Sequence, residues 1–178
     1  MRIYLPATSV VLRTLAERGA IGPAPLTAFA VTPGLREWYG VGAADSDTDE
    51  LEYAAMSEAA RASLRLIDGD ESAARRRVVV ALDAPAEVAA VRDDLDRGVV
   101  VLSAPVGSAQ IAAIHVDDTE AESVIGAASS AIVAADLGEQ QAQDVVDDAE
   151  GFELSWYAIQ ELDALIASLE AGPHPSAS

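Results

Sequence analysis

The sequence contains no cysteine and no lysine. Without cysteine the chain can form no disulfide, thiol nucleophile, zinc–thiolate site or iron–sulfur cluster. Without lysine it lacks the amine of a Schiff base and the lysine of a phosphate-binding P-loop. These two absences exclude several large classes of enzyme.

Long apolar runs are also missing. The longest aliphatic runs, Val78–Leu82 and Val99–Leu102, have the length of a strand and are far too short to span a membrane. The apolar stretch at the N-terminus ends at Pro6, which is too early for the core of a signal peptide. We therefore expect a cytoplasmic protein with no membrane partner.

Basic residues are few and all lie within residues 1–97. The sequence has 30 acidic residues against 11 basic ones, for a net charge of −19. A nucleic-acid partner is excluded, because that affinity comes from neutralising phosphates with basic side chains. Residues 98–178 hold 14 acidic residues and no lysine or arginine. The simplest interpretation is a solvated acidic face, and the alternatives are a basic protein partner or a divalent cation.

Strand-like and helix-like segments alternate along the chain. The segments with strand patterns are 2–5, 26–31, 78–82, 99–102 and 111–116. Helices are expected after a cap at Thr8 or Ser9, after Thr32-Pro33, over 53–67, from Pro85 to a stop at Gly98, over 119–137, over 142–149 and over 154–169. Such alternation favours a parallel or mixed sheet with helices packed against it.

We predict an α/β fold with a mixed sheet of about five strands, flanking helices and an all-helical C-terminal third. Residues 1–171 are expected to form a single α/β domain. Residues 172–178 are expected to be a disordered polar tail.

Short segments spread along the chain form a recognisable combination: Met1–Thr8, Leu26–Pro33, Leu35–Tyr39, Ala62–Leu64, Ala113–Asp118, Trp156–Tyr157 and Gln160–Leu162. Together they resemble an uncharacterised family of actinobacterial proteins, a domain of unknown function, over nearly the whole chain to about Leu169. The resemblance implies a cytoplasmic bacterial protein. It supplies no activity, cofactor or catalytic residue.

His115 is the one histidine outside the C-terminal tail, so acid–base chemistry near neutral pH would depend on it. It lies in an apolar strand, and no nucleophile-elbow pattern accompanies it. A core histidine with a satisfied hydrogen bond is therefore the preferred interpretation, and no catalytic residue is assigned.

Carboxylates follow the strand that carries His115. Asp117 and Asp118, joined by Asp147 and Glu150 if the later helix packs nearby, would suit a divalent cation such as magnesium. Capping of the helix that begins near Thr119 is the simpler role for Asp117 or Asp118. No cofactor other than such a metal is expected.

Aromatic residues make up only 4% of the chain, which singles out the segment around Arg36 and Trp38. Arg, Trp and Tyr are the residues that binding hot spots use. Packing against the last helix is the preferred role for Trp38, so that Trp38→Ala would cost about 3 kcal/mol. The alternative is a small-ligand pocket lined by Tyr4, Arg36, Trp38 and His115.

Three arginines, 75–77, precede the strand at 78–82. They are able to hold a phosphate, but we expect them to flank the edge of the sheet, where charge prevents mispairing. The function expected overall is a non-enzymatic cytoplasmic interaction or scaffold protein with an acidic C-terminal half. A metal-dependent hydrolase and a small-ligand-binding protein are the alternatives.

Overall fold

The structure is a computed structural model that describes residues 1–40 and 48–171. The strands are β1 (Arg2–Ala7), β2 (Ala20–Ile21), β3 (Leu26–Phe29), β4 (Val78–Asp83), β5 (Ala89–Val91), β6 (Val99–Leu102), β7 (Val106–Gly107), β8 (Ile111–Asp117) and β9 (Leu154–Tyr157). The helices are α1 (Ser9–Arg18), α2 (Pro33–Trp38), α3 (Thr48–Asp68), α4 (Glu122–Asp136), α5 (Gln140–Asp148) and α6 (Leu162–Glu170). The tail expected at residues 172–178 lies outside the described residues.

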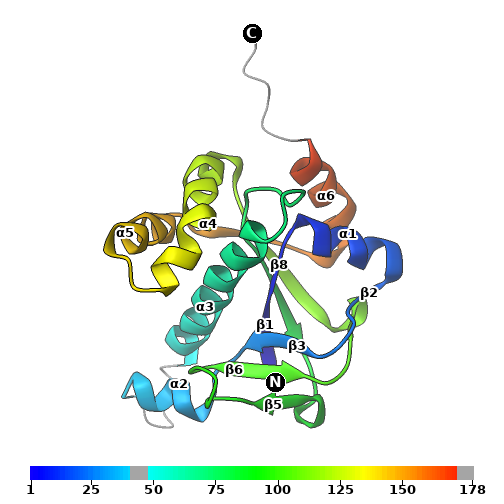
Figure 1. Cartoon of the computed structure of the whole chain (residues 1–178). Coiled ribbons are helices and arrows are strands. Elements are labelled where there is room, and N and C mark those ends of the chain that lie inside the picture. Colours follow the sequence, from blue (N-terminus) through cyan, green and yellow to red (C-terminus); the bar gives the residue numbers. More distant parts are fainter. Residues whose placement is uncertain (41–47, 172–178) are drawn as a thin grey trace.

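The described strands form a seven-stranded sheet in the order β5-β6-β3-β1-β4-β8-β9, and β2 pairs with β7 in a separate ribbon. Every pair in both sheets is antiparallel. The mixed α/β class is therefore confirmed, while the expected mixed sheet of about five strands was wrong in strand number and in pairing. Figure 1 shows the sheet with β5 and β6 at one end and β8 crossing behind α3.

The five predicted strands are the five inner strands of the sheet, and the two that the prediction missed are its edges. β5 lies in the segment expected to be a helix from Pro85, and β9 lies in the segment expected to be the last helix. The all-helical C-terminal third was therefore wrong, because strand structure reaches Tyr157. Edge strands such as β5, whose last two residues are exposed, lack the continuous apolar pattern of a buried strand.

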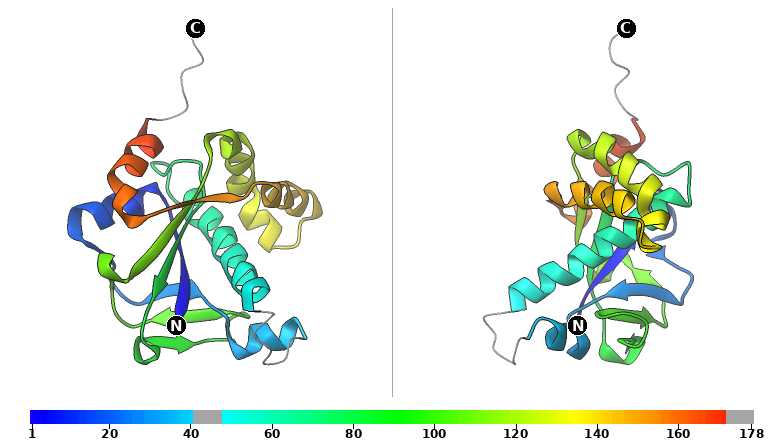
Figure 2. Two further views of the ribbon diagram at one scale, coloured as in Figure 1. Left: turned by 180° about the vertical axis from the view of Figure 1, so that it is seen from behind. Right: turned by 60° about the vertical axis from the view of Figure 1, so that its left-hand side comes forward.

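Helices cover both faces of the sheet. Leu12 and Leu15 of α1 and Leu165 of α6 pack on one face against Ile3 and other residues of the inner strands. The opposite face packs against α3, chiefly through Leu51 and small neighbouring side chains. Figure 2 shows α1 and α6 beside each other and α4 and α5 grouped next to α3. β4 is consequently buried on both faces, as the unbroken apolar run predicted.

The starts of two helices agree with the sequence prediction. The Thr8 Oγ1 accepts a hydrogen bond from the Val11 N–H and caps α1, which ends at Gly19 with a left-handed φ of 74°. The Thr32 Oγ1 caps α2 in the same way by accepting from the Leu35 N–H at 3.2 Å. Local sequence therefore sets the residue at which each of these two helices begins.

A row of alanines joins α4 and α5 to α3. Five buried alanines recur every seven residues: Ala121, Ala128, Ala135, Ala142 and Ala149. They pack with Ile125, Ile132 and Val146, and with Leu64 and Ile67 of α3. Because alanine side chains are short, they let helices approach closely. Within the described residues, no helix is long and apolar enough to cross a membrane.

Candidate functional site

The four residues predicted to line a small-ligand pocket are distributed over separate parts of the fold. Tyr4 on β1 and His115 on β8 lie on the sheet face that α3 covers, with β4 between them. Arg36 and Trp38 lie on α2. None of the principal cavities among the described residues is lined by more than one of these four side chains.

His115 is half-buried, and no hydrogen bond to its imidazole is found among the described residues, so the expected core histidine with a satisfied hydrogen bond was wrong. Burial lowers the pKa of its imidazole, and the positive charge of Arg2 lowers it further. Trp156 is the residue opposite His115 in the neighbouring edge strand. The folded protein therefore favours the neutral form of His115.

The two tryptophans do not pack as expected. Trp38 is 61% exposed and Trp156 is 62% exposed. The guanidinium of Arg97 lies 3.4 Å from the ring centroid of Trp38, which is a cation–π contact at the surface. The packing role expected for Trp38 was therefore wrong.

The carboxylates of the predicted metal site do not converge. Asp117 is fully buried and bound by protein N–H groups, whereas Asp118, Asp147 and Glu150 are exposed. The Asp118 Oδ1 accepts a hydrogen bond from the Ser155 Oγ at 2.9 Å, and neither aspartate side chain caps the helical turn at Thr119. Throughout residues 1–40 and 48–171, no three His, Asp or Glu side chains are close enough together to hold a metal ion.

Asp117 instead forms an ion pair with Arg77. Its Oδ2 accepts from the backbone N–H and the Nε of Arg77, and its Oδ1 accepts from the Arg77 Nη2, each at 2.8 Å. Arg77 Nη2 also donates to the Phe152 carbonyl oxygen, and Arg76 Nε donates to the Asp117 carbonyl oxygen at 2.7 Å. These arginines precede an inner strand, so the predicted role at a sheet edge was wrong. These hydrogen bonds and this ion pair connect β4, β8 and the turn before β9.

An open groove runs along the outer side of α3 toward α5. This α3–α5 groove has a volume of about 430 Å³. Its lining combines aromatic, acidic and apolar side chains: Tyr39, Glu50, Tyr53, Ala54, Ser57, Glu58, Arg61, Leu64, Val146, Glu150 and Phe152. Tyr39 and Tyr53 are more than half exposed, at 54% and 57%. A smaller hollow of about 120 Å³ shares Tyr53 and Phe152 and extends toward Glu153.

The electrostatics of the α3–α5 groove are negative. The one arginine among its described lining residues, Arg61, already faces Asp136 of α4, with 3.5 Å between the Nη2 and the Oδ1. Arg65, one turn further along α3, donates to both oxygens of the same carboxylate. Burial raises the pKa of Glu58, and the negative charge of Asp96 raises it further, while nearby arginines oppose this. A cation entering the groove would therefore stabilise a carboxylate that is poorly solvated.

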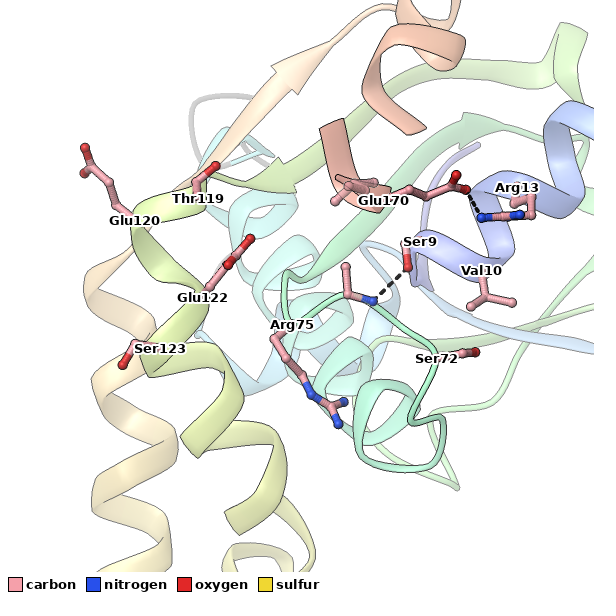
Figure 3. A pocket seen from close by; sticks show the side chains of 12 residues that line it. Ser9, Val10, Arg13, Ser72, Arg75, Thr119, Glu120, Glu122, Ser123 and Glu170 are labelled. Atoms are coloured by element: carbon pink, nitrogen blue, oxygen red, sulfur yellow. Dashed lines mark hydrogen bonds and ion pairs between the residues drawn. The ribbon is translucent and has the colours of Figure 1, made fainter. Parts of the chain in front are cut away.

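A larger cavity of about 1020 Å³ lies at the other end of the molecule. It is lined from α1, from the loop after α3, from the start of α4 and from the end of α6: Ser9, Val10, Arg13, Ser72, Ala74, Arg75, Thr119, Glu120, Glu122, Ser123, Leu169 and Glu170. Figure 3 shows the carboxylate of Glu122 pointing toward the other labelled side chains, whereas Glu120 and Ser123 point away from them. We refer to it as the Arg75–Glu122 cavity.

The sequence contained a signal for the groove that its interpretation missed. Tyr53 begins the helix predicted over 53–67, and it lies on a stripe with Glu50, Ser57, Glu58 and Arg61 at helical spacing. That stripe is polar and aromatic, so it indicates a solvent-facing surface. No comparable signal relates the Arg75–Glu122 cavity residues, which come from four distant segments.

The chain matches the model of one protein family over residues 1–166, and that model is described as a family of unknown function (DUF6912). The match confirms the resemblance to an uncharacterised family. No curated protein and no solved structure matches the chain significantly.

Proposed function

The chain belongs to this family of unknown function, and we propose that it is a non-enzymatic interaction protein that binds a basic protein segment in the α3–α5 groove. The observation that carries the proposal is the composition of that groove. Two exposed tyrosines lie beside the glutamates Glu50, Glu58 and Glu150, and the lining arginine, Arg61, is already engaged by Asp136.

This composition suits arginine or lysine side chains. A cation over a tyrosine ring gains about 0.5–1 kcal/mol at an exposed site. Carboxylates around the ring add charge-assisted hydrogen bonds, which are about twice as strong as neutral ones. Glu58 contributes in particular, because its half-buried carboxylate gains a partner on binding.

The overall charge supports association with the same kind of partner. A net charge of −19 attracts a cationic segment over long range and raises its association rate. The groove would then supply the specific contacts. The cytoplasmic location expected from the sequence is part of this proposal. The described residues bring together neither the carboxylates predicted for a metal-dependent hydrolase nor the residues predicted for a pocket around Tyr4 and His115, so neither alternative is proposed.

Fluorescence polarisation with a short labelled peptide of alternating arginine and glycine tests the proposal. We expect saturable binding to the full chain that weakens when salt rises from about 0.1 M to about 1 M, since the Debye length falls from about 10 Å to about 3 Å. Glu58→Gln and Tyr53→Ala should each weaken binding about fivefold, which corresponds to about 1 kcal/mol. Tyr53→Phe should retain most of the affinity, because the ring remains.

The matched control is Asp163→Asn. Asp163 is exposed on α6, which covers the opposite face of the sheet, and the substitution changes the net charge as Glu58→Gln does. It should leave binding unchanged within twofold. If it weakens binding as much as Glu58→Gln, the attraction is a general property of the acidic surface and the groove is not the site.

A further inference from the structure

The Arg75–Glu122 cavity contains charges of both signs that the described protein does not fully pair. Arg13 of α1 forms an ion pair with Glu170, the last residue of α6, on one wall. Neither Arg75 nor Glu122 has an ion-pair partner among the described residues. Both side chains are half-buried, and therefore each retains an unused charge beside the cavity.

Hydrogen-bonding groups also line this cavity. Ser9 is buried, and its Oγ accepts a hydrogen bond from the Ala74 N–H at 2.9 Å. A serine that accepts in this way still has its own O–H to donate. Arg75 uses its Nη1 to donate to the Ile67 carbonyl oxygen at 2.8 Å, which holds the guanidinium while its other N–H groups remain available. Figure 3 shows Ser9 next to the Arg13–Glu170 pair, on the other side of the cavity from Glu122.

The balance of charges restricts the ligand. Glu122 and Glu170 balance Arg13 and Arg75, while Glu120 points away from the other labelled side chains, so the cavity offers no net positive charge to a phosphate or other polyanion. A polycation would meet Arg13 and Arg75. A molecule with one ammonium and one carboxylate satisfies both Glu122 and Arg75 without leaving a charge unpaired.

The size and lining of the cavity point to more than one amino-acid unit. Its volume of about 1020 Å³ is at the upper end of the range of ligand pockets, about 300–1,000 Å³. Val10, Ala74 and Leu169 add apolar surface to the walls. We propose that this cavity binds a small zwitterion, namely a short peptide with a free ammonium and a free carboxylate, between Glu122 and Arg75. This site is separate from the α3–α5 groove and does not depend on the function proposed for it.

Isothermal titration calorimetry of the full chain with trialanine tests the proposal. We expect one trialanine per chain, and no binding of N-acetyl-trialanine or of trialanine amide, because each lacks one of the two charges. Absence of heat with trialanine at millimolar concentration would overturn the proposal. Equal binding of the capped peptides would overturn it too, since the charges would then not be recognised.

Two variants assign the ammonium site. Glu122→Gln should weaken trialanine binding about tenfold or more, as expected for loss of a charge-assisted hydrogen bond. Glu120→Gln is the matched control, since Glu120 is a neighbouring glutamate that points away from the other labelled side chains, and it should bind within twofold of the unchanged protein. Both positions are at the surface or half-buried, so both variants should fold. An equal loss in the two variants would refute the assignment to Glu122.

Arg75→Gln tests the carboxylate site and should weaken trialanine binding to a similar degree. Because Arg75 also bonds the Ile67 carbonyl oxygen, its fold is checked by circular dichroism, and Glu122→Gln keeps the test valid if this variant is unstable. Unchanged affinity in a folded Arg75→Gln protein would contradict the proposal.

Discussion

The buried ion pair between Arg77 and Asp117 makes a strong prediction about stability. In Asp117→Asn the carboxylate loses its charge, while the guanidinium of Arg77 stays in a site where its side chain is only 6% exposed. Asparagine keeps one oxygen acceptor but puts an NH2 donor in place of the other oxygen, so that guanidinium is left with the amide oxygen and the Phe152 carbonyl oxygen as acceptors. Removing one partner of a buried pair in this way costs about 3–5 kcal/mol.

Urea unfolding followed by circular dichroism measures this cost. A domain is stable by about 5–15 kcal/mol, so the substitution should remove a large fraction of the free energy of unfolding. At about 2–4 °C per kcal/mol for a chain of this size, the melting temperature should fall by about 6–20 °C. The control is Asp118→Asn, which changes an exposed neighbour bonded to Ser155 and should cost about 0.5 kcal/mol or less.

A double variant separates the ion pair from simple packing. Arg77→Met combined with Asp117→Leu removes both charges together and should recover most of the stability lost in Asp117→Asn. If Asp117→Asn costs no more than Asp118→Asn, the ion pair does not hold these strands together and the reasoning is refuted. If the double variant is less stable than Asp117→Asn, the Arg77 hydrogen bonds matter more than charge burial.

Three further predictions concern the other features of the fold. Burial, and then the charge of Arg2, lower the pKa of His115 in the folded protein. The stabilisation that comes from neutral His115 should therefore be fully present above the unfolded histidine pKa of about 6.5 and should be lost as the pH falls below it. Urea titrations at several pH values should show a smaller loss of stability at low pH in His115→Gln. A Cβ on Gly34 would lie 2.5 Å from the carboxylate carbon of Asp93, so Gly34→Ala should cost about 1–3 kcal/mol in thermal unfolding, whereas Gly151→Ala, which meets nothing within 4 Å, should cost much less. Trp38→Ala should cost only about 1 kcal/mol, because the exposed ring loses little beyond its contact with Arg97, and a loss of about 3 kcal/mol would restore the packing role expected from sequence.

The inner part of the sheet was predictable because its strands carry continuous apolar runs. The same runs did not reveal the pairing direction. Burial on both faces is typical of parallel sheets, but here an antiparallel strand, β4, is buried on both faces because helices cover both sides of the sheet. β5 and β9 were missed because an edge strand pairs on one side only and tolerates polar residues. Local capping by Thr8 and Thr32 was predictable, because the cap oxygen and the N–H group that donates to it lie within a few residues.

Contacts between distant segments could not be predicted from the sequence. Asp93 accepts hydrogen bonds from the Thr32 Oγ1 and from the Gly34 and Gly98 N–H groups, and so fixes α2 to the turn between β5 and β6. Burial alone would raise the pKa of Asp93, but these hydrogen bonds together lower it. In the same way Asp117 was predicted to be a helix cap or a metal ligand, since the arginine that neutralises it lies 40 residues away. Candidate sites built from four segments, such as the Arg75–Glu122 cavity, follow from the tertiary fold alone.

The alanine row between α4 and α5 has a consequence for the groove that α5 borders. Each alanine buries little apolar area, so this helical pair gains less hydrophobic free energy per residue than the leucine- and isoleucine-rich layer around α1 and α6. Local opening therefore costs least where small side chains form the contact. Val146 and Glu150 form one wall of the groove. A segment bound there therefore stabilises the packed state of α4 and α5, and a tighter-binding segment stabilises it more. Occupancy of the groove and order in α4 and α5 are thus thermodynamically linked.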